Sequence, residues 1–386
     1  MKFGLFAHSS YSLWPLYEQL KTHGDCVWAV NNRHLLKELQ ARPEVSTRFC
    51  DNPTDLSLPW IVVRGINRVY RAAGKDPSQI FLQKLVSAVA PDVWLSDTAT
   101  VMTKLHVTAP RVQVFHSLPF KNHVFVPSTA EYDLILVPSS YYRDELRRRY
   151  PQLAASRVQA VGWSRADIFR APPFSREATL ARLGLDPARR TVLFAPTYDL
   201  FPPDRFFPES WGDPYRVFES LCRDLAAAEV NFILKLHHFS VRLIRDTRLR
   251  AIAERHGAVW FNAVNKFYME DPRELLYATD LLITDISGAA TDFLPLDRPI
   301  VFIDVADQQL WLTADLRRED RAGACVSDPQ GLQPAIMQNL EHPALFADAR
   351  RRLREKVFDS LDGRAAERAC AAVLEFCHDG HVGGLG

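Results

Sequence analysis

Long apolar runs are absent from the sequence. The longest ones, such as residues 281–283 and 300–303, fall far short of the roughly 18 to 20 residues that a membrane-spanning helix needs. The apolar segment 3–7 is also too short for the core of a signal peptide, and polar residues follow it where a small-residue cleavage site would stand. We therefore expect neither a membrane span nor a leader, and we expect a cytoplasmic location.

The sequence also lacks an excess of charge and lacks closely paired cysteines. Its 47 basic and 46 acidic side chains leave a formal net charge of +1, which argues against a dedicated nucleic-acid-binding protein. The six cysteines include no C-x-x-C pair, and Cys370 and Cys377 with His378 and His381 match no zinc-binding spacing. We expect reduced cysteines in the core, no metal site and no nucleic-acid partner.

Short apolar segments alternate with segments of helical periodicity along most of the 386 residues. This alternation is typical of βαβ units that build a parallel sheet. The sequence therefore predicts an α/β protein with two doubly wound domains. The first series of predicted strands is 3–7, 26–30, 61–63, 93–95, 112–115 and 134–137, and the second is 191–195, 232–236, 259–261, 281–284 and 300–303.

The predicted domain boundary lies between the two series. Residues 169–175 contain Pro172 and Pro173, whose restricted backbones suit a linker. We predict Rossmann-like domains over residues 1–171 and 172–378 and a flexible glycine-rich tail over 379–386. The helical segment 343–378 is expected to cross back over the first domain. Two such domains that face each other across a cleft form the GT-B architecture.

Polar residues follow the carboxyl ends of four predicted strands. Ligands of open parallel sheets bind beyond these ends. A serine or glycine there commonly caps a helix, and the same geometry presents backbone N–H groups that can bind an anion. We therefore expect the substrate site at this edge of both sheets. The residues concerned are His116, Thr197, His237, Asp285, Ser287 and Gly288.

Seven motifs, in order along the chain, resemble those of the CDP-glycerol glycerophosphotransferase family, the teichoic-acid primases and polymerases, whose catalytic domain has the GT-B fold. Five positions depart from the family pattern: Phe115, Ser117, Leu118, His238 and Gly288. The resemblance therefore supports the reaction type better than it supports glycerol as the transferred group. The motifs are QVFHSLPFK at 113–121, GWSRAD at 162–167, LFAPTY at 193–198, KLHH at 235–238, DLLITDISGAATDF at 280–293, RPIVF at 298–302 and DGRAAER at 362–368.

The resemblance implies a transferase of cell-surface polymer synthesis. Such an enzyme moves a polyol phosphate from a CDP-activated donor to an acceptor hydroxyl in a teichoic-acid-like or capsule polymer, and it releases CMP. The transferred group can be glycerol phosphate, ribitol phosphate or a related pentose phosphate. The implied partners are the CDP-linked donor, bound by the C-terminal domain, and a polyol-phosphate or saccharide acceptor, either lipid-linked or a growing polymer, bound on the N-terminal side.

The resemblance also implies roles for particular residues. The two histidines implicated in the family fall on His116 and His237. Imidazole is a base near pH 7, so we predict that His116 deprotonates the acceptor hydroxyl and that His237 contacts the diphosphate. Asp285 and Asp292 also fit helix capping, and Arg165 and Asp167 also fit a structural pair. The further predicted ligands are Thr197, Ser287, Gly288, Asp285 and Asp292 for the donor, and Lys121, Arg165 and Asp167 for the acceptor or cleft.

The sequence leaves open whether the protein holds Mg²⁺ and whether it contacts a membrane. No D-x-D motif ends a strand, so we expect no required cofactor, and a loosely held Mg²⁺ is left open. Arginine-rich segments at 143–149 and 350–354 fit either solvated helix faces or peripheral contact with the inner face of the cell membrane.

Two alternative functions remain open. One is a GT-B nucleotide-sugar glycosyltransferase or epimerase, because a fold does not determine a function. Release of a nucleoside diphosphate, rather than CMP, would identify the protein as a nucleotide-sugar glycosyltransferase. The other is a non-catalytic polymer-binding protein of the same fold, against which the presence of both His116 and His237 argues.

Overall fold

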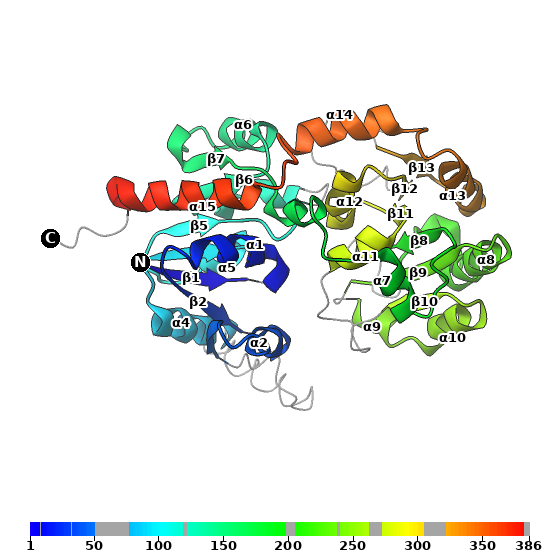
Figure 1. Cartoon of the computed structure of the whole chain (residues 1–386), viewed down its shortest axis with the longest axis horizontal. Coiled ribbons are helices and arrows are strands. Elements are labelled where there is room, and N and C mark those ends of the chain that lie inside the picture. Colours follow the sequence, from blue (N-terminus) through cyan, green and yellow to red (C-terminus); the bar gives the residue numbers. More distant parts are fainter. Residues whose placement is uncertain are drawn as a thin grey trace. The chain divides into compact units, whose positions relative to one another are not determined.

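The computed structural model describes residues 1–7, 9–31, 33–50, 77–118, 122–197, 205–237, 240–261, 272–304 and 322–381 (Figure 1). The chain divides into two compact units. The first unit comprises Met1–His116, Val124–Asp167 and Phe358–Gly386, and the second comprises Ser117–His123 and Ile168–Val357.

The first unit is built on a parallel sheet, which has seven strands among the described residues, in the order β3-β2-β1-β4-β5-β6-β7. Its strands are β1 (Lys2–Phe6), β2 (Asp25–Val30), β3 (Ser46–Phe49), β4 (Val93–Ser96), β5 (Arg111–Gln113), β6 (Leu134–Val137) and β7 (Val158–Ala160). Its helices are α1 (Ser10–Leu20), α2 (Arg33–Gln40), α4 (Pro77–Val89), α5 (Ala99–Met102), α6 (Ser140–Arg149) and α15 (Ala365–Phe376).

The core of this unit follows from the alternation of side chains along its strands. Phe3 and Leu5 of β1 point to the same face, where they pack with Leu13 and Leu16 of α1 and Val373 of α15, all fully buried. Figure 1 shows α15 beside α1, although more than 340 residues of chain separate them. Both faces of β1 are buried, as is usual for parallel sheets covered by helices.

The second unit has a parallel sheet of its own, with six strands in the described part of the chain, in the order β10-β9-β8-β11-β12-β13. Its strands are β8 (Thr191–Phe194), β9 (Asn231–Lys235), β10 (Val259–Phe261), β11 (Leu281–Thr284), β12 (Ile300–Ile303) and β13 (Ala324–Val326). Its helices are α7 (Arg176–Arg182), α8 (Pro214–Ala227), α9 (Val241–Ile244), α10 (Thr247–Arg255), α11 (Pro272–Ala278), α12 (Gly288–Phe293), α13 (Leu332–Glu341) and α14 (Ala347–Val357).

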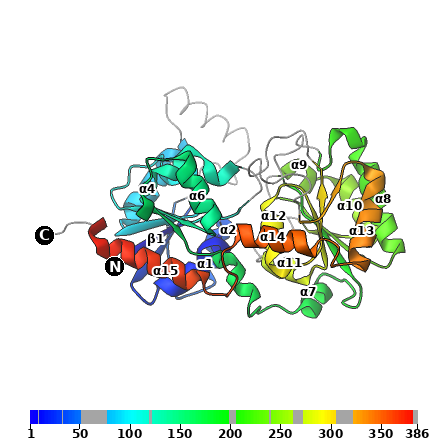
Figure 2. The ribbon, with the colours of Figure 1, turned by 90° about the horizontal axis from the view of Figure 1, so that it is seen from above.

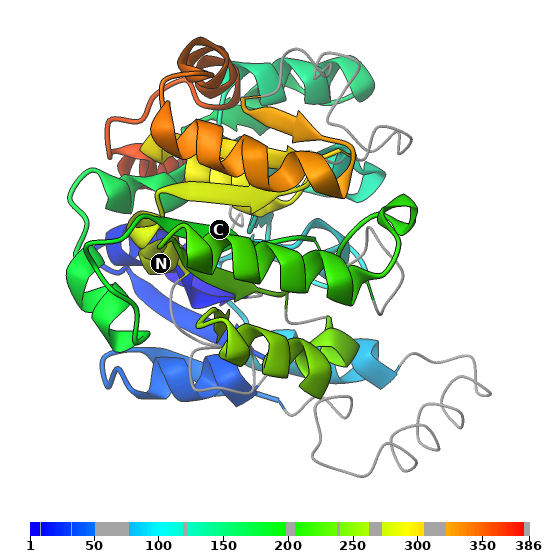
Figure 3. The same cartoon turned by 90° about the vertical axis from the view of Figure 1, so that its right-hand side faces the viewer.

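Helices cover both faces of this second sheet. Figure 2 shows α8, α10 and α13 on one face and α11 and α12 on the other, and Figure 3 shows the first three stacked over the strands. Their apolar sides share one core with the sheet, to which α8 contributes Phe218 and α13 contributes Ile336. Phe194 of β8 stacks on Phe207 with 5.2 Å between the ring centroids.

Two carboxylates hold the end of the chain on the first unit. Asp359 accepts hydrogen bonds of 2.8 Å from the N–H and from the hydroxyl of Ser140, at the start of α6. Asp167 accepts bonds from the N–H groups of Ala365 (3.2 Å) and Ala366 (2.8 Å), at the start of α15. The first N–H groups of a helix have no partner within the helix, so carboxylates stabilise both helix ends.

The two predicted doubly wound parallel sheets are confirmed, while the boundaries differ from the prediction. The units divide after Asp167, because Asp167 binds α15, whereas the sequence predicted a division after residue 171. Residues 117–123 belong to the second unit, where the hydroxyl of Thr291 donates to the Leu118 carbonyl. The edge strands β3, β7 and β13 were not predicted, because each has only three or four residues and because β3 and β7 are partly polar. The predicted strand at 61–63 and the end of the predicted tail, residues 382–386, lie outside the described residues.

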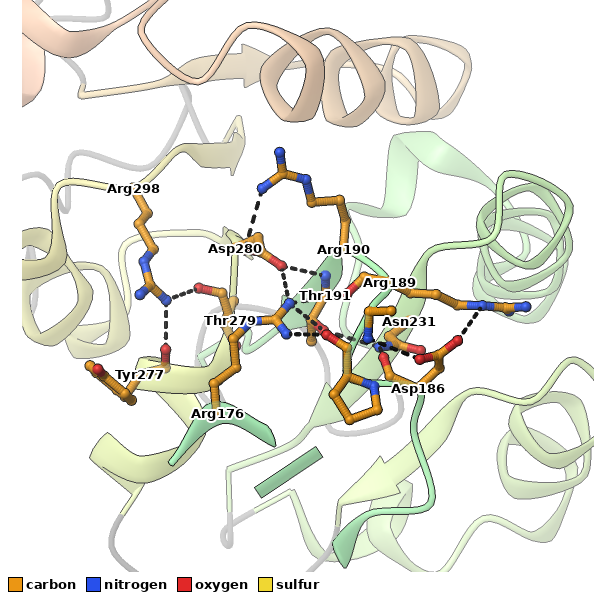
Figure 4. A network of polar contacts seen from close by, with 12 residues as sticks. Arg176, Asp186, Arg189, Arg190, Thr191, Asn231, Tyr277, Thr279, Asp280 and Arg298 are labelled. Carbon is orange, nitrogen blue, oxygen red and sulfur yellow. Dashed lines mark hydrogen bonds and ion pairs between the residues drawn. The ribbon is translucent and has the colours of Figure 1, made fainter. Parts of the chain in front are cut away.

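A polar network lies at the amino-terminal edge of the second sheet (Figure 4). The Asp280 carboxylate accepts hydrogen bonds from Arg176 Nη2 (2.6 Å) and from the Thr191 N–H (2.7 Å). The Arg298 guanidinium donates to the carbonyls of Tyr277 (2.6 Å) and Thr279 (2.5 Å), and burial lowers the pKa of Arg298. Asp280 and Arg298 are therefore structural, although both belong to the sequence motifs.

Replacement of Asp280 by alanine is expected to destabilise the protein by about 2 kcal/mol, because it leaves Arg176 and the Thr191 N–H without a charged acceptor. The Asp280 side chain is 18% exposed. The matched control is Asp348→Ala: Asp348 also pairs with an arginine, Arg351, but is 77% exposed, so its loss should cost no more than about 0.5 kcal/mol. Urea unfolding measures both values, and equal losses would contradict this role for Asp280.

Candidate active site

His116 lies just beyond the end of β5 in the first unit and is half-buried. Its N–H and its ring Nδ1 both bond to the carbonyl oxygen of Asp97, at 3.2 Å and 2.9 Å. A carbonyl oxygen only accepts hydrogen bonds, so Nδ1 must carry a proton. In the neutral ring Nε2 therefore holds the lone pair, which is the arrangement a general base needs.

Asp97 follows β4, the strand next to β5, and is 1% exposed. Its carboxylate accepts hydrogen bonds from the hydroxyls of Ser12 in α1 and of Thr98 (2.8 Å). Sequence reasoning missed this residue, because it belongs to none of the seven motifs. The available signal was its position two residues after the predicted strand 93–95, since the selected residues also lie at or near the ends of predicted strands.

Arg165 also contacts His116. It is 3% exposed, and its Nη1 donates to the His116 carbonyl oxygen. The guanidinium lies over the ring of Tyr11, 4.6 Å from the centroid, and 5.6 Å from that of Trp163. These contacts favour the structural alternative for Arg165 that the sequence had left open.

Two sequence motifs assemble into one scaffold around α15. Asp167, whose pKa is raised mainly by burial, holds the start of the helix. Arg368 donates from Nε to the Val161 carbonyl (2.9 Å) and forms a bidentate pair with Asp362, and its bonds lower the pKa of Asp362 to about 2. Gly162 has φ +93°, and a Cβ there would lie 2.8 Å from Arg368 Nη2. The motifs at 162–167 and 362–368 therefore support the fold, and the structural alternative is favoured for Asp167 too.

Asp285 organises the corresponding edge of the second unit. It is fully buried, and its carboxylate accepts 2.9 Å hydrogen bonds from the N–H groups of Thr197 and Ser287. The loops after the adjacent strands β8 and β11 are thereby tied together. Asp285 thus shapes the loops that carry the predicted donor ligands.

Ser287 and Gly288 begin the helix α12. The Ser287 hydroxyl accepts a hydrogen bond of 3.3 Å from the Ala289 N–H, so Ser287 is an N-cap. The helix has only six residues, so its dipole is small. Any anion here would be held by single N–H groups. Asp292 lies within the same helix and is 8% exposed.

His237 follows β9, the neighbour of β8, and is half-buried. Its carbonyl accepts a hydrogen bond of 2.8 Å from the Ser240 N–H. Since β9, β8 and β11 are adjacent and parallel, His237, Thr197 and Asp285 follow strand ends at one edge of the sheet. Lys121, and the motif residues Tyr198 and His238, lie outside the described residues.

Metal binding, membrane insertion and thiol reactivity each depend on features that the described residues show directly. Within the described ranges, no group of three or more histidine, cysteine, aspartate or glutamate side chains could hold a metal ion. The helices placed in the structure include none that is long and apolar enough to cross a membrane. Cys26 and Cys222 are buried, and burial raises the pKa of each thiol to about 12, so neither is a ready nucleophile.

The two sheets with their flanking helices define the class: a GT-B fold. The wall teichoic acid polymerase TagF has a solved structure that superposes with a TM-score of 0.65 at 17% identity, covering 98% of this chain and 89% of that chain. A UDP-N-acetylglucosamine 2-epimerase gives a TM-score of 0.59 at 14% identity, covering 98% and 96%. At such identities the similarity establishes the fold.

The family is shown by the sequence. The CDP-glycerol:poly(glycerophosphate) glycerophosphotransferase family matches residues 100–375, which include all seven motifs, and the chain belongs to this family. A relative is the teichoic acid poly(glycerol phosphate) polymerase of Bacillus spizizenii, which is 27% identical over 303 residues, or 74% of this chain and 68% of that protein. The chain is therefore an enzyme, and the predicted family is confirmed.

Proposed function

We propose that this enzyme transfers glycerol phosphate, or a related polyol phosphate, from a CDP-activated donor to a hydroxyl of a cell-surface polymer and releases CMP. The observation that carries the proposal is the family match over residues 100–375. It is supported by TagF, of the same fold, which has been solved after soaking with CDPG. The likeness to the epimerase concerns the fold alone.

In the proposed reaction His116 is the general base. The acceptor oxygen attacks the phosphorus that carries the polyol, while Nε2 of His116 removes the hydroxyl proton. A bond forms between the acceptor oxygen and phosphorus, the bond from that phosphorus to the bridging oxygen breaks, and CMP leaves with the electron pair. The Nδ1 bond to Asp97 supports this role, because it leaves the lone pair on Nε2.

The donor is proposed to bind residues of the second unit. His237, Thr197, Ser287 and the Gly288 N–H are proposed to contact the diphosphate, whose charge needs preorganised donors. Asp285 acts on these residues through the loops that it holds, since it binds the Thr197 and Ser287 N–H groups. Asp292 remains a proposed donor contact.

Lys121 remains a proposed acceptor contact. The acceptor is proposed to be a polyol phosphate or a saccharide with a lipid anchor, which would bring the enzyme to the inner face of the cell membrane. Arg148 and Arg149 of α6 pair with Glu145, and Arg350 and Arg354 of α14 pair with Asp297. Part of the positive charge of both arginine-rich helices is thus paired with carboxylates of the protein itself.

A comparison of donors tests the proposal. The enzyme is incubated with a polyol-phosphate acceptor and with CDP-glycerol, CDP-ribitol or UDP-N-acetylglucosamine, with and without EDTA. We expect CMP from at least one CDP-polyol, and we expect EDTA to leave this release intact, because the proposed site uses no cofactor. Chromatography identifies the nucleotides. Release of only nucleoside diphosphates, or conversion of only the UDP-sugar, would overturn the proposal.

A further inference from the structure

His116 is held at three of its atoms. Its N–H and its Nδ1 bond to the Asp97 carbonyl oxygen, and its own carbonyl oxygen accepts from Arg165. The backbone contacts fix where the residue lies, and the Nδ1 contact fixes the orientation of the ring. Loss of a backbone contact would let the residue shift, and loss of the Nδ1 contact would let the ring turn or change its protonated nitrogen.

The Asp97 peptide is itself anchored. Its N–H donates to the carbonyl of Phe6 in β1 (3.3 Å), and its carboxylate is bonded by the hydroxyls of Ser12 and Thr98. A carboxylate that is 1% exposed is costly to bury unless such bonds compensate it. The carboxylate therefore ties the loop after β4 to α1, and this holds the Asp97 carbonyl oxygen against His116.

Arg165 is anchored on the other side. It lies in the short 3₁₀ helix η4 (Ser164–Phe169), which Asp167 ties to α15. The Tyr11 ring packs against the guanidinium and adds a cation–π attraction. The guanidinium thus meets the His116 carbonyl in a nearly fixed position.

We infer that Asp97 and Arg165 are positioning residues, which hold His116 so that its neutral ring keeps a proton on Nδ1 and presents Nε2 to the acceptor hydroxyl. The inference rests on the proposed function, in which His116 is the base. It deepens that proposal, because it explains how the chain selects one of the two tautomers. Displacement of a catalytic group by about 1 Å can cost about 100-fold in rate.

The chain offers a matched control. Arg157 is half-buried, whereas Arg165 is buried, but it belongs to the same unit and also donates from its guanidinium to backbone carbonyls, those of Ala130 (3.2 Å) and Tyr132. Loss of Arg157 removes the same kind of contact, but from Ala130 and Tyr132, neither of which is a proposed site residue.

The experiment compares Arg165→Met, Arg165→Lys, Asp97→Asn and Arg157→Met in the full chain. Turnover of CDP-glycerol should fall by about 10-fold to 100-fold in Arg165→Met and Asp97→Asn, while KM stays within about threefold. Arg165→Lys should recover part of the loss. Arg157→Met should keep the wild-type kcat, whatever stability it loses in urea. If Asp97→Asn fails to fold, Ser12→Ala tests the same anchor with a smaller change.

A spectroscopic measurement reports on the tautomer without activity. The enzyme is labelled with ¹⁵N-histidine, and the signals of His116 are identified by their loss in His116→Gln. Wild type should show a protonated Nδ1, and Arg165→Met and Asp97→Asn should show a mixture of tautomers. A protonated Nε2 in wild type, or equal kcat in Arg165→Met and Arg157→Met, would overturn the inference. If His116→Gln were fully active, the base role would fail, and the ¹⁵N signals would still decide the positioning.

Discussion

Replacement of His116 by glutamine is expected to lower turnover by about 100-fold to 10,000-fold, the usual contribution of a general base. Glutamine keeps a polar side chain of similar reach, so the fold should persist, but it cannot take up a proton. Affinity for the donor should stay near the wild-type value, because the base acts on the acceptor. Single-turnover rates with CDP-glycerol and calorimetric titration with CDP-glycerol measure the two quantities.

The control for this variant is His106→Gln. His106 lies in the same unit and is exposed, and its backbone N–H and carbonyl form 2.8 Å hydrogen bonds with the side-chain amide of Gln83. Its replacement should leave both the rate and the melting temperature near wild type. Full activity in His116→Gln would contradict the assignment of the base.

Replacement of His237 by alanine is expected to weaken donor binding by about 10-fold to 100-fold and to lower turnover as well. A hydrogen bond to a charged group contributes about 1.5–3 kcal/mol, and the proposed contact with the diphosphate exists before the transition state is reached. Both binding and rate should therefore change, in contrast to the His116 variant. Calorimetric titration with CDP-glycerol measures the affinity.

The control for His237 is His342→Ala, because His342 is exposed and lies in the same unit, at the end of α13. This control should bind the donor normally. If His237→Ala also binds CDP-glycerol with wild-type affinity, the proposed contact is wrong. If His116→Gln and His237→Ala weaken donor binding equally, the distinction between their roles is lost.

Much of the fold could be predicted, because buried parallel strands leave a simple pattern of short apolar segments. The same pattern does not identify β3, β7 and β13, which have only three or four residues and gain their pairing from one neighbour at a sheet edge. β3 and β7 are also partly polar. Registers such as Phe3↔Val93 depend on contacts between distant segments, which one sequence does not reveal.

The candidate site was only partly predictable, for a similar reason. Asp280 and Asp285 belong to one motif, yet Asp280 binds Arg176 at the amino-terminal end of β11 and Asp285 binds Thr197 at the other end. The two residues lie at opposite ends of β11, and the sequence shows this once β11 is assigned. The bond of Asp167 to Ala366 joins residues 199 positions apart, and it depends on the packing of α15 on the first unit. The contacts of Arg165 with His116 and of Asp97 with Ser12 likewise join segments that are distant in the sequence.

The most direct test follows one phosphorus atom. CDP-glycerol is labelled at the phosphorus that carries glycerol, incubated with enzyme and acceptor, and the products are separated. If the acceptor attacks that phosphorus, the label must appear in the lengthened acceptor as a phosphodiester, and the released CMP must be unlabelled. Label recovered in CDP, with unlabelled glycerol on the acceptor, would mean that the bond to glycerol carbon had broken, and it would contradict the proposed phosphoryl transfer.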